Sequence, residues 1–196
     1  MCCSLVLARS LGLVLLPLAL VCMLANLLLL FPMGEVSYVQ QDRVSSYIWY
    51  WGGLGGGGLL MLVPATVFVS LGRCGCCWTD TLMMCGSALA ALLGLLGSGY
   101  CFIISGLILL QGPQCFTSLG WTYPFADQRG RYLFRPDSWS QCLQPLHVVE
   151  WNTMLACVLV CVALLEFIVC MVQLVSGLVN AVCRPCCFKQ EYSLNT

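Results

Sequence analysis

Apolar and polar positions divide the chain into four long apolar runs separated by polar segments. An α-helix rises 1.5 Å per residue, so about 20 apolar residues cross a hydrocarbon core of about 30 Å. Every run reaches that length, and we therefore expect four membrane-spanning helices. The expected spans are residues 11–31, 48–71, 83–110 and 152–182. The segments between and beyond them are residues 1–10, 32–47, 72–82, 111–151 and 183–196.

Composition agrees with a bilayer environment. Hydrophobic residues make up 60% of the chain, charged residues 8%, and the mean hydropathy is +0.92. A soluble domain carries roughly 25% charged residues, about three times as many. The formal net charge is zero, so no bulk electrostatic field draws the protein toward nucleic acid, and nucleic acid is excluded as a partner class.

Small residues in two neighbouring spans predict close helix packing. The second span contains residues 52–58, which are all glycine except Leu54. In a membrane such a run lets two backbones approach closely, although a locally frayed helix end is the alternative. The third span carries a matching stripe, so we expect these two spans to form an antiparallel hairpin at the bundle centre. The stripe consists of Gly86, Ala90, Gly94, Ser98 and Gly106.

Cysteine placement identifies the cytosolic side. Four spans put both termini on one face, and the basic residues do not identify it because equal numbers flank the spans on both faces. Most cysteines at span ends lie on the terminus-bearing face and are too closely bunched to pair with one another. Juxtamembrane cysteines in the reducing cytosol are the usual sites of S-palmitoylation. We therefore expect cytosolic termini, with palmitoylation candidates Cys2, Cys3, Cys74, Cys76, Cys77, Cys85, Cys183, Cys186 and Cys187.

The opposite face carries Cys115 and Cys142, which bracket much of the long polar segment. An isolated pair of this kind suits an oxidising exterior, and we predict a disulfide that stabilises the segment by roughly 3–4 kcal/mol on chain-entropy grounds. The predicted fold class is an all-α membrane protein. It is a four-transmembrane-helix bundle with a small extracellular loop, residues 32–47, and a larger extracellular loop, residues 111–151.

Zinc binding is the alternative use of the cytosolic thiols. Cys74, Cys76, Cys77 and Cys85 supply four thiolates, the number that a structural zinc ion takes. Their Cys-x-Cys-Cys spacing differs from that of zinc knuckles, and no second Cys-x-x-Cys pair follows at finger distance. We favour acylation and expect no metal or other cofactor.

One ionisable residue, Glu166, lies near the middle of the fourth span. A carboxylate at bilayer depth is a candidate for an ion or proton path, which makes a transporter or channel component the alternative function. The other interpretation is a protonated or hydrogen-bonded carboxyl that faces the bundle, with Asn26 and Gln173 as possible polar neighbours. We favour this structural interpretation.

The large loop contains the candidate recognition residues. Its aromatic side chains either form a contact surface or pack as a small core, and Arg129, Arg131 and Arg135 are the candidates for outward partner contacts. A cysteine nucleophile paired with His147, the only histidine, is the catalytic alternative. No oxyanion motif accompanies it, so we predict that the protein is not an enzyme. The aromatic residues are Trp121, Tyr123, Phe125, Tyr132, Phe134 and Trp139.

Several motifs, in this order along nearly the whole chain, resemble one known family. They are Phe31-Pro32 with Gly34-Glu35, the segment 56–59 (Gly-Gly-Gly-Leu), the segment 97–101 (Gly-Ser-Gly-Tyr-Cys), Gly112-Pro113 with Cys115, Trp139 with Cys142, and the segment 148–152 (Val-Val-Glu-Trp-Asn). Together they resemble the transmembrane 4 L6 family, tetraspanin-like surface proteins related to the L6 tumour-associated antigen.

The resemblance implies a four-span, multi-pass plasma-membrane protein without enzymatic activity. Such proteins associate laterally with integrins and tetraspanins among membrane lipids, and affect adhesion, motility or proliferation. The large loop lacks the Cys-Cys-Gly motif of true tetraspanins, so the likeness to tetraspanins is one of layout. We therefore predict a non-enzymatic, tetraspanin-like membrane organiser. A claudin-like adhesion element between cells is a third hypothesis.

Two positions depart from the family pattern. Met33 stands where relatives often have asparagine, so the hydrogen bond of that turn is in doubt. Asn152 is followed by Thr153 and Met154, so the glycosylation sequon that relatives often carry there is absent. We predict an unglycosylated protein.

Overall fold

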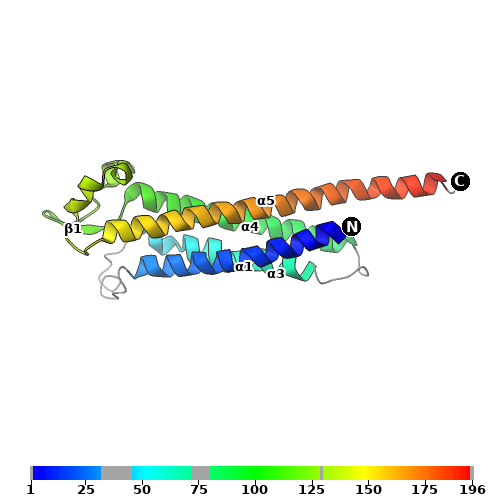
Figure 1. Ribbon diagram of the computed structural model, residues 1–196, viewed down its shortest axis with the longest axis horizontal. Coiled ribbons are helices and arrows are strands. Elements are labelled where there is room, and N and C mark those ends of the chain that lie inside the picture. The colour runs from blue at the N-terminus through cyan, green and yellow to red at the C-terminus, as the bar shows by residue number, and fades with distance from the viewer. Residues whose placement is uncertain (1, 32–45, 72–79, 129, 195–196) are drawn as a thin grey trace.

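The computed structural model describes the backbone of residues 2–31, 46–71, 80–128 and 130–194, and the side chains of residues 6–31, 46–71, 85–128 and 130–179. Long helices lie side by side with a small loop domain at one end (Figure 1). The first is α1 (Cys2–Leu30), and the last two are α4 (Asp80–Gln111) and α5 (Val148–Leu194). The second span is composite: η2 (Ser46–Tyr50), η3 (Gly52–Leu59) and α3 (Leu60–Leu71).

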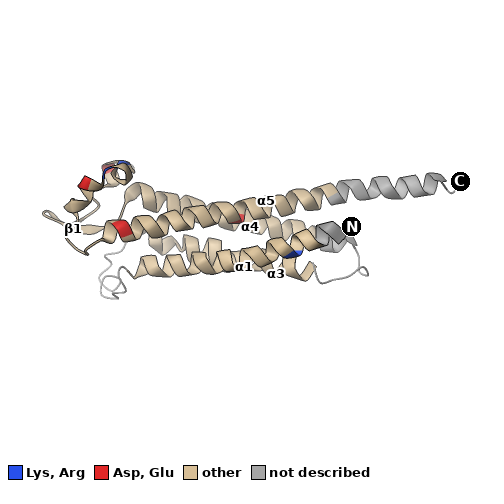
Figure 2. Ribbon diagram, viewed as in Figure 1, with Lys and Arg blue, Asp and Glu red and all other residues tan. Residues whose placement is uncertain are grey.

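Four helical stretches are long and apolar enough to cross a membrane: Val6–Leu30, Ser46–Leu71, Cys85–Gln111 and Val148–Val179. They overlap the four runs expected from hydropathy, and the predicted four-span, all-α fold class is confirmed. Figure 2 shows that charged positions are sparse along the described part of the bundle. Large apolar side chains such as Leu96, 70% exposed, point outward, as hydrocarbon solvent permits.

The helices form a ring in the order α1, α3, α4, α5, in which each packs against its two neighbours. Two apolar clusters fill the interior. The cluster nearer the loop includes Leu29, Ile108 and Leu159. The cluster nearer the termini includes Leu15 and Phe68, together with Met61, Ala65, Ala90, Ala91 and Cys170.

The glycine run forms a π-helix, η3, that touches all three other spans. A Cβ added at Gly52 would lie 2.8 Å from Ile104 Cβ in α4, and one added at Gly53 would lie 2.8 Å from Leu159 Cδ2 in α5. At Gly58 the added atom would collide with Met23 in α1. The expected packing face is therefore confirmed. It contacts three helices where the prediction named one, because side chains added at these glycines would collide with α1, α4 and α5.

The predicted small-residue stripe on α4 is wrong at its ends. Gly94 packs against Cys170 of α5 and Pro64 of α3, but at Gly86 and Gly106 an added Cβ would have none of the described atoms within 4 Å. Steps of four residues drift on a helix of 3.6 residues per turn, so positions 86 and 106 point about 160° apart. Gly97, outside the stripe, makes the close approach to the second span at Gly56.

The loop module, which we define as residues 112–147, combines a hairpin with short helical turns. Strands β1 (Cys115–Thr117) and β2 (Gly120–Thr122) pair antiparallel, with Phe116 opposite Trp121, and Phe116 also bridges to Gln144. The sequence analysis did not predict these strands, since three-residue strands carry no usable alternation. The helical turns are η4 (Ala126–Gln128), η5 (Arg131–Phe134) and η6 (Pro136–Gln141).

Candidate functional site

A disulfide joins Cys115 to Cys142, with the two Cα atoms 5.5 Å apart. The bond connects β1 to the residue after η6, so the hairpin and the helical turns become one closed unit. The pairing predicted from the sequence is confirmed. Because Cys142 is disulfide-bonded, it is not available as the nucleophile of a Cys-His pair.

The aromatic residues of the loop module divide between core and surface. Phe125 and Tyr132 are fully buried and stack with ring centroids 4.6 Å apart. The indole Nε1 of Trp139 donates to the Tyr132 carbonyl oxygen at 2.9 Å. Gly112 has φ of +76°, and a Cβ there would lie 3.1 Å from Phe125, so glycine suits both the turn and the packing. The interpretation as a small core is therefore confirmed for Phe125 and Tyr132, whereas a contact surface stays a prediction for exposed residues such as Phe134.

Two aromatic side chains cap helix ends where proline removes a hydrogen bond. In α4, the carbonyl of Leu109 would accept from residue 113, but Pro113 has no N–H. The Tyr132 hydroxyl donates to that oxygen instead, at 2.9 Å. Likewise Pro32 follows Leu28 by four residues, and the indole Nε1 of Trp151 donates to the Leu28 carbonyl at 3.1 Å.

These contacts fasten the loop module to the bundle. Tyr123 adds a link to the second span, because its hydroxyl accepts a hydrogen bond from the Ser46 backbone N–H at 3.2 Å. Burial raises the pKa of Tyr132 from its ordinary value of 10.0 to about 12, so the phenol is neutral at physiological pH and remains a donor. The module is thus held in a fixed orientation on the bundle end.

The outward face of the loop module carries apolar and basic side chains. Leu119 at the hairpin tip is 94% exposed and Phe134 is 88% exposed. Arg131 begins η5 and Arg135 directly follows its last residue, Phe134; both arginines are exposed. Arg129, the third predicted contact residue, lies outside the described residues.

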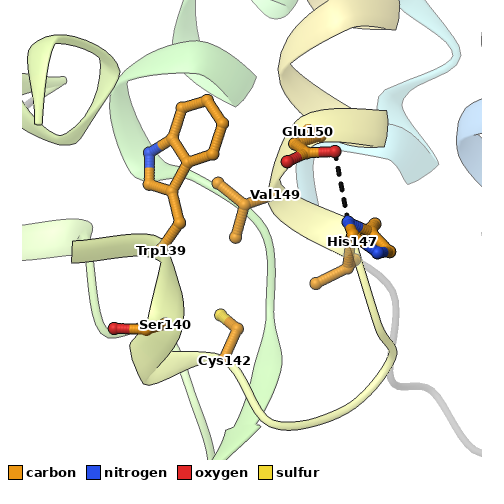
Figure 3. A pocket seen from close by; sticks show the side chains of 7 residues that line it. Trp139, Ser140, Cys142, His147, Val149 and Glu150 are labelled. Carbon is orange, nitrogen blue, oxygen red and sulfur yellow. Dashed lines mark ion pairs between the residues drawn. The ribbon is translucent and has the colours of Figure 1, made fainter. Parts of the chain in front are cut away.

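A shallow pocket lies where the loop module meets the first turn of α5 (Figure 3). Its volume is about 200 Å³. His147 Nδ1 and Glu150 Oε2 lie 3.2 Å apart at its edge, both substantially exposed. The sequence analysis had assigned no role to Glu150. The lining residues are Trp139, Ser140, Cys142, His147, Val148, Val149 and Glu150.

Glu166 is completely buried in the bundle and neighbours the thiols of Cys22 and Cys101. Both sulfur atoms pack on Gly57, since an added Cβ would lie 2.9 Å from Cys22 Sγ and 3.0 Å from Cys101 Sγ. Among the described residues, no side chain or backbone group makes a well-formed hydrogen bond to either carboxyl oxygen. Cys101 Sγ is also 3.9 Å from the Ser105 hydroxyl.

The two polar residues suggested as neighbours of Glu166 are Asn26 and Gln173, and both contact other residues. Gln173 donates from Nε2 to the Ser87 hydroxyl at 3.0 Å. Asn26 packs on Gly53, whose added Cβ would lie 2.9 Å from Asn26 Cβ. The sequence analysis missed the thiols beside Glu166 because cysteine counts as apolar in a hydropathy reading.

Of the nine palmitoylation candidates, Cys85 is the member whose side chain is described, and it is exposed. The side chains of the other eight lie outside the described residues: Cys2, Cys3, Cys74, Cys76, Cys77, Cys183, Cys186 and Cys187.

The chain matches known proteins over almost its whole length. The family described as L6 membrane protein matches residues 1–187. Human transmembrane 4 L6 family member 1 is 44% identical over 192 residues, which cover 94% of this chain and 95% of that protein. Mouse member 4 is 41% identical over 187 residues, 91% of each chain. Bovine member 5 is 40% identical over 190 residues, 95% of this chain and 96% of that protein.

No solved structure matches the chain. The family match and these relatives, together with four membrane-spanning helices, establish that the chain belongs to the transmembrane 4 L6 family.

Proposed function

We propose that the protein is a non-enzymatic membrane organiser that associates laterally with integrins, tetraspanins and other membrane proteins at the plasma membrane. Through these partners it affects adhesion, motility or proliferation. The observation that carries the proposal is the rigidly mounted loop module with an exposed Phe134, 88% accessible, between two exposed arginines. Aromatic and arginine side chains are enriched at binding hot spots, and a fixed mounting lowers the entropy lost on binding.

The loop module and the lipid-facing helices have different parts in this proposal. The helices offer an apolar surface to neighbouring spans, while the Arg131 to Arg135 segment selects among partners. The disulfide supports an extracellular position for the module, since such bonds persist in oxidising compartments. The termini are then cytosolic, and the nine candidate cysteines on that side are the sites of acylation.

Substitutions that leave the module folded test the proposal better than deletion. Phe134→Ser combined with Arg135→Ser removes two exposed side chains, whereas deletion of residues 115–142 would also remove the Tyr132 cap. The variant should lower recovery of integrins and tetraspanins from mild detergent several-fold. Leu119→Ser, at the exposed hairpin tip, is the matched control and should leave recovery unchanged. Equal recovery of partners with native protein and with the double variant would indicate that the helices, not the loop module, select the partners.

Acylation of the candidate cysteines is tested separately. Hydroxylamine-sensitive acyl labelling should fall when Cys85 and the other candidate cysteines are changed to serine. Labelling that persists in the fully substituted variant would contradict acylation at these positions.

A transporter or channel component remains the second candidate, because Glu166 is buried beside two thiols in the middle of the bundle. Glu166→Gln discriminates between the two functions. Normal surface expression and normal partner recovery would support a structural carboxyl. Loss of a measured proton or ion flux in proteoliposomes would instead support transport.

A further inference from the structure

The pocket at the base of the loop module has the size of a small functional group. Its volume of about 200 Å³ is below the roughly 300–1,000 Å³ of sites for drug-sized ligands. Its walls come from η6 and from the start of α5, so a ligand there would contact both the loop module and a membrane-spanning helix.

The length of α5 is consistent with a pocket at the level of the lipid headgroups. The apolar stretch of α5, Val148–Val179, has 32 residues, and at 1.5 Å per residue it is longer than a hydrocarbon core of about 30 Å. The stretch is therefore long enough for its first turn to lie outside the core. Glu150 is one turn before Met154, which is 73% exposed, so the carboxylate lies directly above the lipid-facing side of α5.

Other side chains near this end of the bundle suit the same depth. Trp49 and Trp51 at the start of the second span are each 44% exposed, as expected of an interfacial aromatic belt. At that depth, phospholipid headgroups can reach the pocket without leaving the bilayer.

The side chains of the walls favour a cationic group. Glu150 supplies a negative charge, and its side chain is 56% exposed, so a ligand can reach it. The Trp139 indole is oriented by the bond from Nε1 to the Tyr132 carbonyl, and Figure 3 shows its ring and the Glu150 side chain on either side of Val149. Aromatic rings attract quaternary ammonium groups through the cation–π interaction, and a carboxylate adds an opposite charge.

We propose that this pocket binds the trimethylammonium group of a choline lipid, with Glu150 and Trp139 as the contacting side chains. The carboxylate repels an anionic headgroup such as that of phosphatidylglycerol. His147 pairs with Glu150 when the pocket is empty and gives way to the ligand. The site would hold one leaflet lipid against the loop module and couple the module's position to lipid composition.

The test uses the full chain in a maltoside detergent, which contains no choline. Native mass spectrometry follows retention of phosphatidylcholine and of phosphatidylglycerol with the same acyl chains. We expect preferential retention of phosphatidylcholine, reduced about tenfold by Glu150→Gln. Soluble phosphocholine at millimolar concentration should displace phosphatidylcholine, because the proposed contacts are to the headgroup, and failure to compete would count against the assignment.

Two further variants keep the proposal open to refutation if Glu150→Gln folds poorly. His147→Gln frees the Glu150 carboxylate and should retain at least as much phosphatidylcholine as native protein. Asp137→Asn, an acidic position on η6 outside the pocket, should leave retention unchanged. Equal retention of the two lipids by native protein, or loss of phosphatidylcholine from the His147 variant, would overturn the assignment.

Discussion

The Tyr132 hydroxyl donates a hydrogen bond of 2.9 Å to the carbonyl oxygen of Leu109, which is the oxygen that Pro113 leaves without a helical donor. One side chain of the loop module therefore completes a membrane-spanning helix. The orientation of the module and the integrity of the end of α4 depend on the same contact.

Tyr132→Phe should destabilise the protein by about 1–3 kcal/mol, because the partly buried Leu109 carbonyl loses its partner. Thermal unfolding in detergent measures the loss, and hydrogen exchange should rise at the end of α4 and in the module together. Tyr123→Phe is the control, since its bond to Ser46 is exposed. A stability equal to that of native protein would show that water satisfies the oxygen equally well.

The same residue predicts a dependence on alkaline pH. Burial raises the pKa of Tyr132 to about 12, so the folded state favours the neutral phenol. Its contribution to stability is complete below pH 10 and is lost as the pH rises through about 12. Phenolate absorbance of native protein minus that of Tyr132→Phe should titrate near pH 12. A difference that titrates near the ordinary value of 10.0 would contradict the buried phenol.

Removal of the disulfide should loosen the loop module and spare the bundle. Changing Cys115 and Cys142 to serine together should lower the stability of the module by roughly 3–4 kcal/mol. Hydrogen exchange should accelerate within residues 112–147, while far-ultraviolet circular dichroism, dominated by the spans, should change little. Cys157→Ser, which alters an exposed free thiol on α5, should affect neither measurement. Unchanged exchange in the double variant would mean that packing alone holds the module.

Two glycines give a matched test of helix packing. A Cβ at Gly56 would lie 2.7 Å from the Gly97 carbonyl oxygen, which is backbone and cannot move aside, so Gly56→Ala should cost about 1–3 kcal/mol. A Cβ added at Gly99 would meet nothing within 4 Å in the described part of the chain, so Gly99→Ala should be neutral or slightly stabilising. Thermal melts of the two purified variants compare them directly, and equal melting temperatures would refute the close approach.

Sequence alone determined the parts of this protein that depend on local composition. Hydropathy gave the four spans, because crossing hydrocarbon requires about 20 apolar residues whatever the helices pack against. Isolation from other cysteines gave the Cys115–Cys142 bond. The prolines at 32 and 113 already imply orphan carbonyls at Leu28 and Leu109, since proline cannot donate.

Tertiary structure decided which groups meet. Only the packed chain shows that Tyr132 and Trp151 satisfy those carbonyls, because a side chain 23 residues away and one 123 residues away are brought to the helix ends by the bundle. The thiols beside Glu166 and the split of the α4 glycine stripe likewise depend on how helices rotate against each other. Local sequence determines the lengths of the spans and leaves the carbonyl oxygens of Leu28 and Leu109 without helical donors. The rotation of the packed helices results from many weak contacts along the chain, and it determines which side chains reach those oxygens.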